Sequence, residues 1–74
     1  MEKKLSYAYP SSSDAERLDY GESGCWIVEI ISKTGVQMSE SAFPSKGIAL
    51  KAFDLVDIPI SRDCQTRAKT FNRN

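Results

Sequence analysis

Hydrophobic and polar residues alternate over residues 3–9, and this period of two predicts a first strand. Leu5, Tyr7 and Tyr9 fall on one side of the extended chain, and polar or small residues lie between them. Pro10 and the serines that follow it end the strand.

A capping pattern predicts a short helix over residues 14–20. Ser13 and Glu16 have the spacing of a capping box, in which each side chain satisfies a backbone N–H of the first turn. Gly21 is a natural stop. Because isolated helices of this length are marginal, we expect packing through apolar residues such as Ala15.

The most apolar stretch, residues 25–31, predicts a buried strand because it is rich in β-branched residues. Residues 33–35 supply turn chemistry, and a weaker alternation follows them. We therefore expect a hairpin that pairs about 25–33 with 36–42.

Helical spacing of apolar residues predicts the main helix, over about 45–56. The apolar stripe consists of Ile48, Ala52, Leu55 and Val56. Gly47 disfavours a helix, so a strand through 47–53 is the alternative.

The C-terminal part predicts two further small elements. Residues 58–60 suit a short edge strand, where proline is tolerated. Cys64, Ala68 and Phe71 then recur at i, i+4 and i+7, which indicates a short C-terminal helix. We expect residues 72–74 to be frayed.

These elements predict an α+β fold in which a small antiparallel sheet packs against one main helix. The sheet combines the hairpin of about 25–42 with the N-terminal strand. The element order also matches a ferredoxin-like arrangement. With 74 residues, the chain is expected to form a single compact domain, 1–74.

The central strand is apolar on both sides. A strand of a sheet with one face in solvent should instead carry polar residues on that face. One side carries Trp26, Val28 and Ile30, and the other carries Ile27 and Ile31. The main helix can cover one side. The other side is then covered by the chain itself, or it is an open face that binds a partner or a second copy.

Composition narrows the class of protein. Lys and Arg together number 10, as do Asp and Glu, which argues against a strongly basic nucleic-acid binder. No apolar run reaches the ~18 residues of a membrane span, and the N-terminus lacks a signal-peptide core. We expect a cytoplasmic protein, in the host cytoplasm if it is phage-encoded.

Candidate chemistry is sparse. The absence of histidine excludes a His-assisted nucleophile. Cys25 and Cys64 are too isolated to form a zinc site, and two small packed side chains are a better interpretation than a disulfide. Asp54 and Asp57 suit a solvated helix end better than an acid–base pair. We expect no enzyme activity, no metal and no cofactor.

Charge is unevenly distributed along the chain. Residues 14–22 form an acidic stretch in which Arg17 is the only basic residue. Its acidic members are Asp14, Glu16, Asp19 and Glu22. Residues 60–74 form a basic stretch in which Asp63 is the only acidic residue. Its basic members are Arg62, Arg67, Lys69 and Arg73. Two ordinary solvated surfaces would also explain this pattern.

These features favour a small non-enzymatic protein-binding protein. We expect an inhibitor or adaptor that occupies a surface of a larger complex, of the kind that phages encode against host defence complexes. Its interface candidates are Trp26, Ile27, Ile31, Asp14, Glu16, Asp19 and Glu22. A homodimer is a further possibility, and weak nucleic-acid binding through the basic C-terminal stretch is the alternative.

Overall fold

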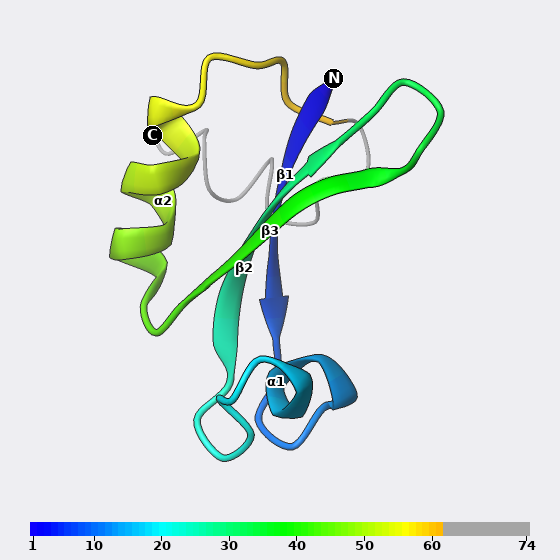
Figure 1. Ribbon diagram of the computed structural model, residues 1–74. Helices are drawn as coiled ribbons and strands as arrows, with labels where there is room; N and C mark the ends of the chain where they lie inside the picture. Colours follow the sequence, from blue (N-terminus) through cyan, green and yellow to red (C-terminus); the bar gives the residue numbers. More distant parts are fainter. Residues whose placement is uncertain (62–74) are drawn as a thin grey trace.

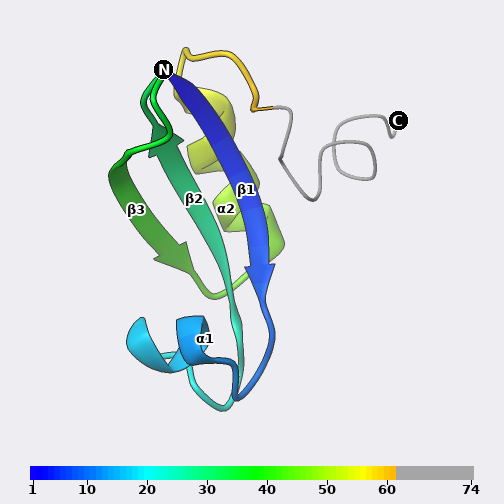
Figure 2. The same ribbon diagram turned by 90° about the vertical axis from the view of Figure 1, so that its right-hand side faces the viewer.

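The computed structural model describes residues 1–61 and shows an α+β fold, as predicted. Strands β1 (Glu2–Ala8), β2 (Cys25–Ile31) and β3 (Gln37–Phe43) form an antiparallel sheet in the order β1-β2-β3. Helix α2 (Lys46–Leu55) covers one face, and helix α1 (Ser13–Arg17) lies over one end of the other face (Figures 1 and 2). The predicted C-terminal helix falls outside the described residues.

The central position of β2 gives the sheet its topology. Leu5 lies opposite Val28, and Trp26 lies opposite Phe43, so side chains of all three strands share a face. A β-bulge interrupts the β2–β3 register at Ile30/Ile31. Because β1 pairs antiparallel with β2 and is not a parallel neighbour of β3, the sheet differs from the predicted ferredoxin-like arrangement.

The segment after α2 returns to the outer edge of β1 as a short parallel bridge between Lys3 and Ile60, where an edge strand was predicted. The Lys3 N–H donates to the Pro59 carbonyl oxygen at 2.8 Å, and the Ser61 N–H donates to the Lys3 carbonyl oxygen at 2.8 Å. The two ends of the described chain therefore lie side by side (Figure 1).

Helix α2 buries a different stripe from the one predicted. It begins at Ser45, whose side chain accepts from the Ile48 N–H, and the helical alternative for 47–53 is confirmed. The side chains that reach the sheet are those of Ala49 and Phe53, both fully buried against Leu5 and Val28. Ile48 and Leu55 were predicted in the core but are 51% and 85% exposed. Ala49 and Phe53 are four residues apart on one side of α2, and a small side chain next to a large ring fits closely against the sheet. This fit sets the rotation of α2 about its own axis.

Helix α1 is shorter than predicted, and its caps differ. Ser12, rather than Ser13, is the N-cap and accepts from the Ala15 N–H. The helix ends at Arg17 with Leu18 as its C-cap, and Asp19, with a positive φ of 68°, turns the chain before Gly21 is reached. The Tyr20 N–H donates to the Ala15 carbonyl oxygen at 2.7 Å, as in a Schellman motif.

A second apolar cluster lies under α1 on the sheet face opposite α2. It consists of Ala8, Ala15, Cys25 and Ile27. The half-buried side chains of Leu18 and Tyr20 pack against it. The chain itself therefore covers this end of the second face.

Lys3 is buried, although lysine seldom is. Its Nζ donates to the carbonyl oxygens of Phe53 at 2.6 Å and of Val56 at 2.8 Å, and it lies 4.4 Å from the centre of the Phe53 ring. The last turn of α2 carries no basic residue of its own, so Lys3 supplies the positive charge that favours a helix C-terminus. Among residues 1–61, no helix is long and apolar enough to cross a membrane.

Candidate functional site: an aromatic cluster beside an acidic segment

Three aromatic rings gather at one end of the sheet, on the face that carries α2. The Tyr7 ring lies 4.9 Å from the Trp26 ring and 5.0 Å from the Tyr9 ring, measured between centroids. The register explains this, because Tyr7 is directly opposite Trp26 and Tyr9 follows two residues later on the same side. We call Tyr7, Tyr9 and Trp26 the aromatic cluster.

The aromatic cluster is only partly covered by the rest of the chain. Trp26 is half-buried and packs against the main core, whereas Tyr9 is 69% exposed. Helix α2 begins beside it, and Lys46 Nζ lies 5.7 Å from the centre of the Trp26 ring. The core therefore holds one side of Trp26 in place, while part of its surface remains accessible to solvent. Residues that anchor protein interfaces have this arrangement.

Gly24 brings the α1–β2 loop against the aromatic cluster. Its φ is +72°, and a Cβ at this position would lie 2.7 Å from the Ala8 carbonyl oxygen and 3.0 Å from the Tyr7 hydroxyl. No other residue type fits so close an approach without strain. The loop that carries the acidic residues therefore passes directly beside Tyr7.

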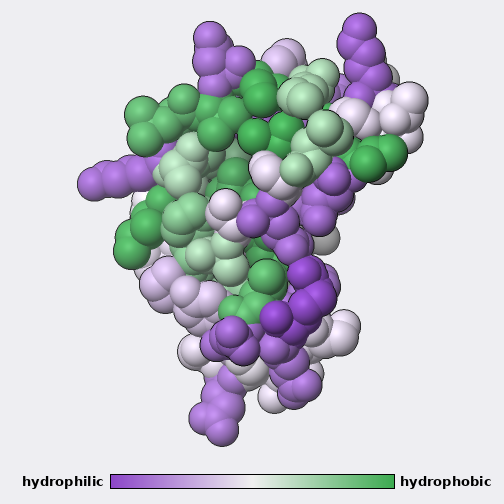
Figure 3. All heavy atoms as spheres, in the orientation of Figure 1, coloured by the Kyte–Doolittle hydropathy of each residue, from purple (hydrophilic) through white to green (hydrophobic). Residues whose placement is uncertain are grey.

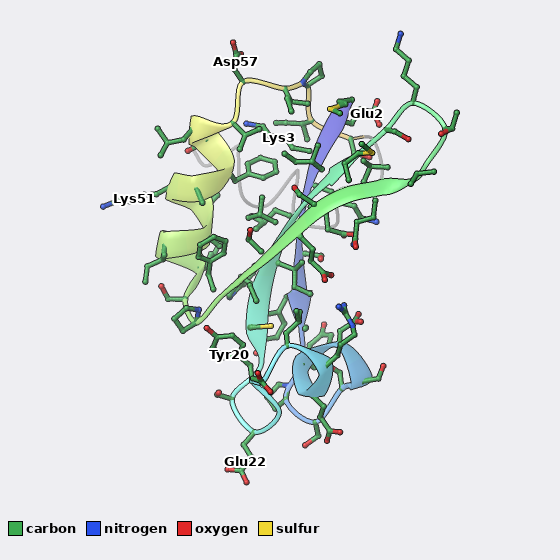
Figure 4. All side chains as sticks on the ribbon, in the orientation of Figure 1. Glu2, Lys3, Tyr20, Glu22, Lys51 and Asp57 are labelled. Atoms are coloured by element: carbon green, nitrogen blue, oxygen red, sulfur yellow. The ribbon has the colours of Figure 1, made fainter. Side chains whose placement is uncertain are left out.

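The acidic stretch predicted from the sequence is exposed. Asp14 and Glu16 lie on α1, and Asp19 and Glu22 lie in the loop that follows it. Figure 4 shows Glu22 pointing away from the body of the molecule, while Tyr20 lies closer to the sheet. We call residues 14–22 the acidic segment.

Arg17, the cation within the acidic segment, is paired with Asp14 of the segment and with Glu40 of β3. Its guanidinium donates to both carboxylate oxygens of Glu40 at 2.7 and 2.9 Å, and to Asp14 at 3.1 Å. Hydrogen bonds from Arg17 lower the pKa of Glu40, and those to Glu40 and Asp14 raise the pKa of Arg17. The carboxylates of Glu16, Asp19 and Glu22 belong to none of the ion pairs within residues 1–61.

The predicted interface residues are not all brought together. Ile27 is only 4% exposed beneath α1, so its place on an open face is corrected. Ile31 is half-buried on the face opposite Trp26, next to Glu2 and Gln37. Trp26 is the predicted apolar candidate that lies at the same end of the sheet as the acidic segment (Figure 2).

The other candidate chemistry is limited in the described chain. Burial raises the pKa of the Cys25 thiol, which is almost inaccessible. A shallow hollow of about 360 Å³ near the N-terminus is lined by Met1, Glu2, Lys33 and Pro59. Residues 1–61 contain no group of three potential metal ligands. The predicted nucleic-acid residues Arg62, Arg67, Lys69 and Arg73 lie outside the described residues, as does Cys64.

Sequence reasoning missed two contacts that shape the site. The Lys46–Trp26 contact and the Arg17–Glu40 pair join residues that are distant in sequence. Local sequence patterns do not indicate either contact, because each joins a helix residue to a strand residue. No protein-family model matches this chain, and neither the curated proteins nor the solved structures contain a match to it.

Proposed function

We propose that this protein is a small non-enzymatic protein-binding protein, an inhibitor or adaptor that occupies a basic surface of a larger complex. The observation that carries the proposal is the partly exposed aromatic cluster at the same end of the sheet as the acidic segment, with Gly24 of the connecting loop packed against Tyr7 (Figure 2). Tryptophan and tyrosine dominate the energetic centres of protein interfaces.

The aromatic cluster has the rigidity that an interface anchor requires. Each ring contacts another ring, and Trp26 also packs against the core, so little side-chain entropy is left to lose on binding. Tyr9 presents a large exposed area next to this fixed support.

The charge beside the aromatic cluster sets the kind of partner. The carboxylates of Glu16, Asp19 and Glu22 attract lysine and arginine, whose cations also bind aromatic faces. Such complementarity accelerates association and rejects acidic partners. It also repels phosphates, which favours a basic protein surface over nucleic acid at this site.

Affinity capture with the full chain, from a lysate treated with nuclease, tests this proposal. We expect Tyr9→Ser to lower partner capture about tenfold, the loss typical of an interface hot spot. The charge reversal Asp19→Lys with Glu22→Lys should lower capture further in low salt. Trp26 is the only tryptophan, so its emission should shift when the captured partner is added back.

Val36→Ser is the matched control, because Val36 is an exposed apolar residue on the hairpin, at the opposite end of β2 from Trp26. It should leave capture unchanged. Capture that survives Tyr9→Ser, or that nuclease abolishes, would contradict the proposal. In the second case, nucleic-acid binding becomes the better explanation.

A further inference from the structure

Helix α2 leaves an apolar stripe exposed on the flank next to the residues that it buries against the sheet. Ile48, Ala52 and Leu55, which we call the outer stripe, recur at i, i+4 and i+7, and Ile48 and Leu55 are largely exposed. Figure 3 shows apolar side chains gathered over α2. The outer stripe does not pack against the sheet, because Ala49 and Phe53 occupy the contact between α2 and the sheet.

The charges of α2 are reversed relative to its dipole. Lys46 is the first residue of the helix, Lys51 lies near its middle, and Asp54 lies in the last turn, with Asp57 just beyond the helix end. An isolated helix prefers the opposite order. Within residues 1–61, neither Lys51 nor Asp54 belongs to an ion pair. Figure 4 shows Lys51 pointing away from the sheet.

We propose that the outer stripe binds the outer stripe of a second copy of this chain, with the two α2 helices antiparallel. A twofold axis near Lys51 and Ala52 places Ile48 of each copy against Leu55 of the other. Lys51 and Asp54 lie on the same flank of the stripe, so the same axis brings Lys51 of each copy beside Asp54 of the other.

The charge order selects both the occupant and its direction. Antiparallel pairing brings the Lys51 of each helix beside the Asp54 of the other, and it also opposes the two dipoles. Parallel twofold pairing would place the Lys51–Asp54 flanks of the two copies on opposite sides of the contact, so these opposite charges could not meet. Small Ala52 in the middle of the stripe allows an axis separation near the lower end of the usual ~8–10 Å.

The size of the contact predicts a weak dimer. Helix α2 has 10 residues, which corresponds to a length of about 15 Å. This is less than a standard interface of ~800 Å² per partner requires, so we expect a dissociation constant on the order of 100 µM. The dimer uses neither Tyr9 nor the acidic segment, so it does not depend on the proposed function.

Sedimentation equilibrium of the full chain from low micromolar to millimolar concentration tests the proposal. The wild-type mass should rise toward that of two chains. Leu55→Glu should give the mass of one chain throughout, with an unchanged unfolding midpoint, because Leu55 is exposed. Lys51→Asp should weaken the dimer about tenfold, and the double swap Lys51→Asp with Asp54→Lys should restore it.

Val36→Glu is the matched control and should dimerise like the wild type, since it adds the same charge at an exposed apolar residue elsewhere. A wild-type mass of one chain at millimolar concentration would overturn the proposal and leave the stripe to a different protein or to none. A dimer that Leu55→Glu leaves intact, or that the double swap does not restore, would also overturn it.

Discussion

Lys3 joins three parts of the fold at the scale of a single residue. Its backbone forms the bridge to Ile60, its stem lies in the core, and its ammonium group binds the last carbonyls of α2. A buried cation is costly unless its hydrogen bonds are made, so these contacts also fix where α2 must end.

Replacing Lys3 with methionine should destabilise the protein by about 3 kcal/mol, because two charge-assisted hydrogen bonds are lost while the apolar stem is kept. Lys4→Met, at the half-buried neighbouring position, should change stability by less than about 0.5 kcal/mol. Urea unfolding followed by Trp26 emission measures both. Equal midpoints for the two variants would show that the Lys3 contacts contribute little.

Two glycines should respond in opposite directions to the same substitution. Gly24→Ala should cost at least about 2 kcal/mol, since it combines a positive φ with a contact of 2.7 Å to the Ala8 carbonyl oxygen. Gly47→Ala, in α2 with open space around its Cβ, should stabilise by about 0.5 kcal/mol. Thermal unfolding of both variants checks the signs, and a stabilised Gly24→Ala would refute the close approach of the loop to Tyr7.

At the scale of the element, α1 shows how a helix of only five residues is kept. Propensity cannot hold it, because isolated helices of this length are unstable. Ser12 caps its start, Asp19 closes its end, and Ala15 is fully buried against the sheet. Arg17 then fastens the helix to β3 through Glu40.

The Arg17–Glu40 pair should make stability depend on acid. The pKa of Glu40 is lowered in the folded state, so its contribution is present above the usual Glu value of 4.5 and is lost as the pH falls through the lower folded value. Glu40→Gln should therefore lower the urea midpoint at pH 7, and its difference from the wild type should shrink in acid. Val36→Ser, an uncharged change at an exposed residue of the hairpin, should show no such trend. A difference that is constant with pH would contradict this assignment.

At the scale of the whole molecule, β2 lies between two apolar clusters. Val28 belongs to the core under α2, and Cys25 and Ile27 belong to the cluster under α1. Neither cluster is large enough to support a fold alone, because small domains bury little surface. The two faces of the sheet are therefore expected to unfold together.

Thiol labelling can test this cooperativity in a Cys64→Ser variant, which leaves Cys25 as the only thiol. Cys25 reports on the α1 side, and Trp26 emission reports on the α2 side. The two signals should share one urea midpoint. Labelling of Cys25 at clearly lower urea would mean that α1 opens independently.

Periodicity predicted the described strands and helices, because each has a local pattern and local end signals. The buried side of α2 was not predictable, since apolar residues occur almost all around 48–56 and only the fit of Phe53 and Ala49 to the sheet selects one side. Ile27 was misplaced because a helix as short as α1 seems too small to cover a strand. Its flanking residues, including Tyr20, complete the cover.

For the candidate site, the sequence identified Trp26 and the acidic residues separately. Their proximity depends on Gly24 and on the Tyr7–Trp26 register, neither of which is visible in local patterns. Lys3 was unpredictable for the same reason, because its partners are 50 and 53 positions away and a lysine in an alternating strand is usually solvated.

The long sequence distance between Lys3 and its hydrogen-bond partners has a consequence for the newly synthesised chain. The first strand leaves the ribosome long before the residues that Lys3 binds have been synthesised. The sheet edge beside Ile60 and the end of α2 can only be completed after nearly all the described residues have emerged. The contacts of the first strand are therefore expected to form only after the segment that carries Ile60 has emerged, and until then this strand is exposed to chaperones.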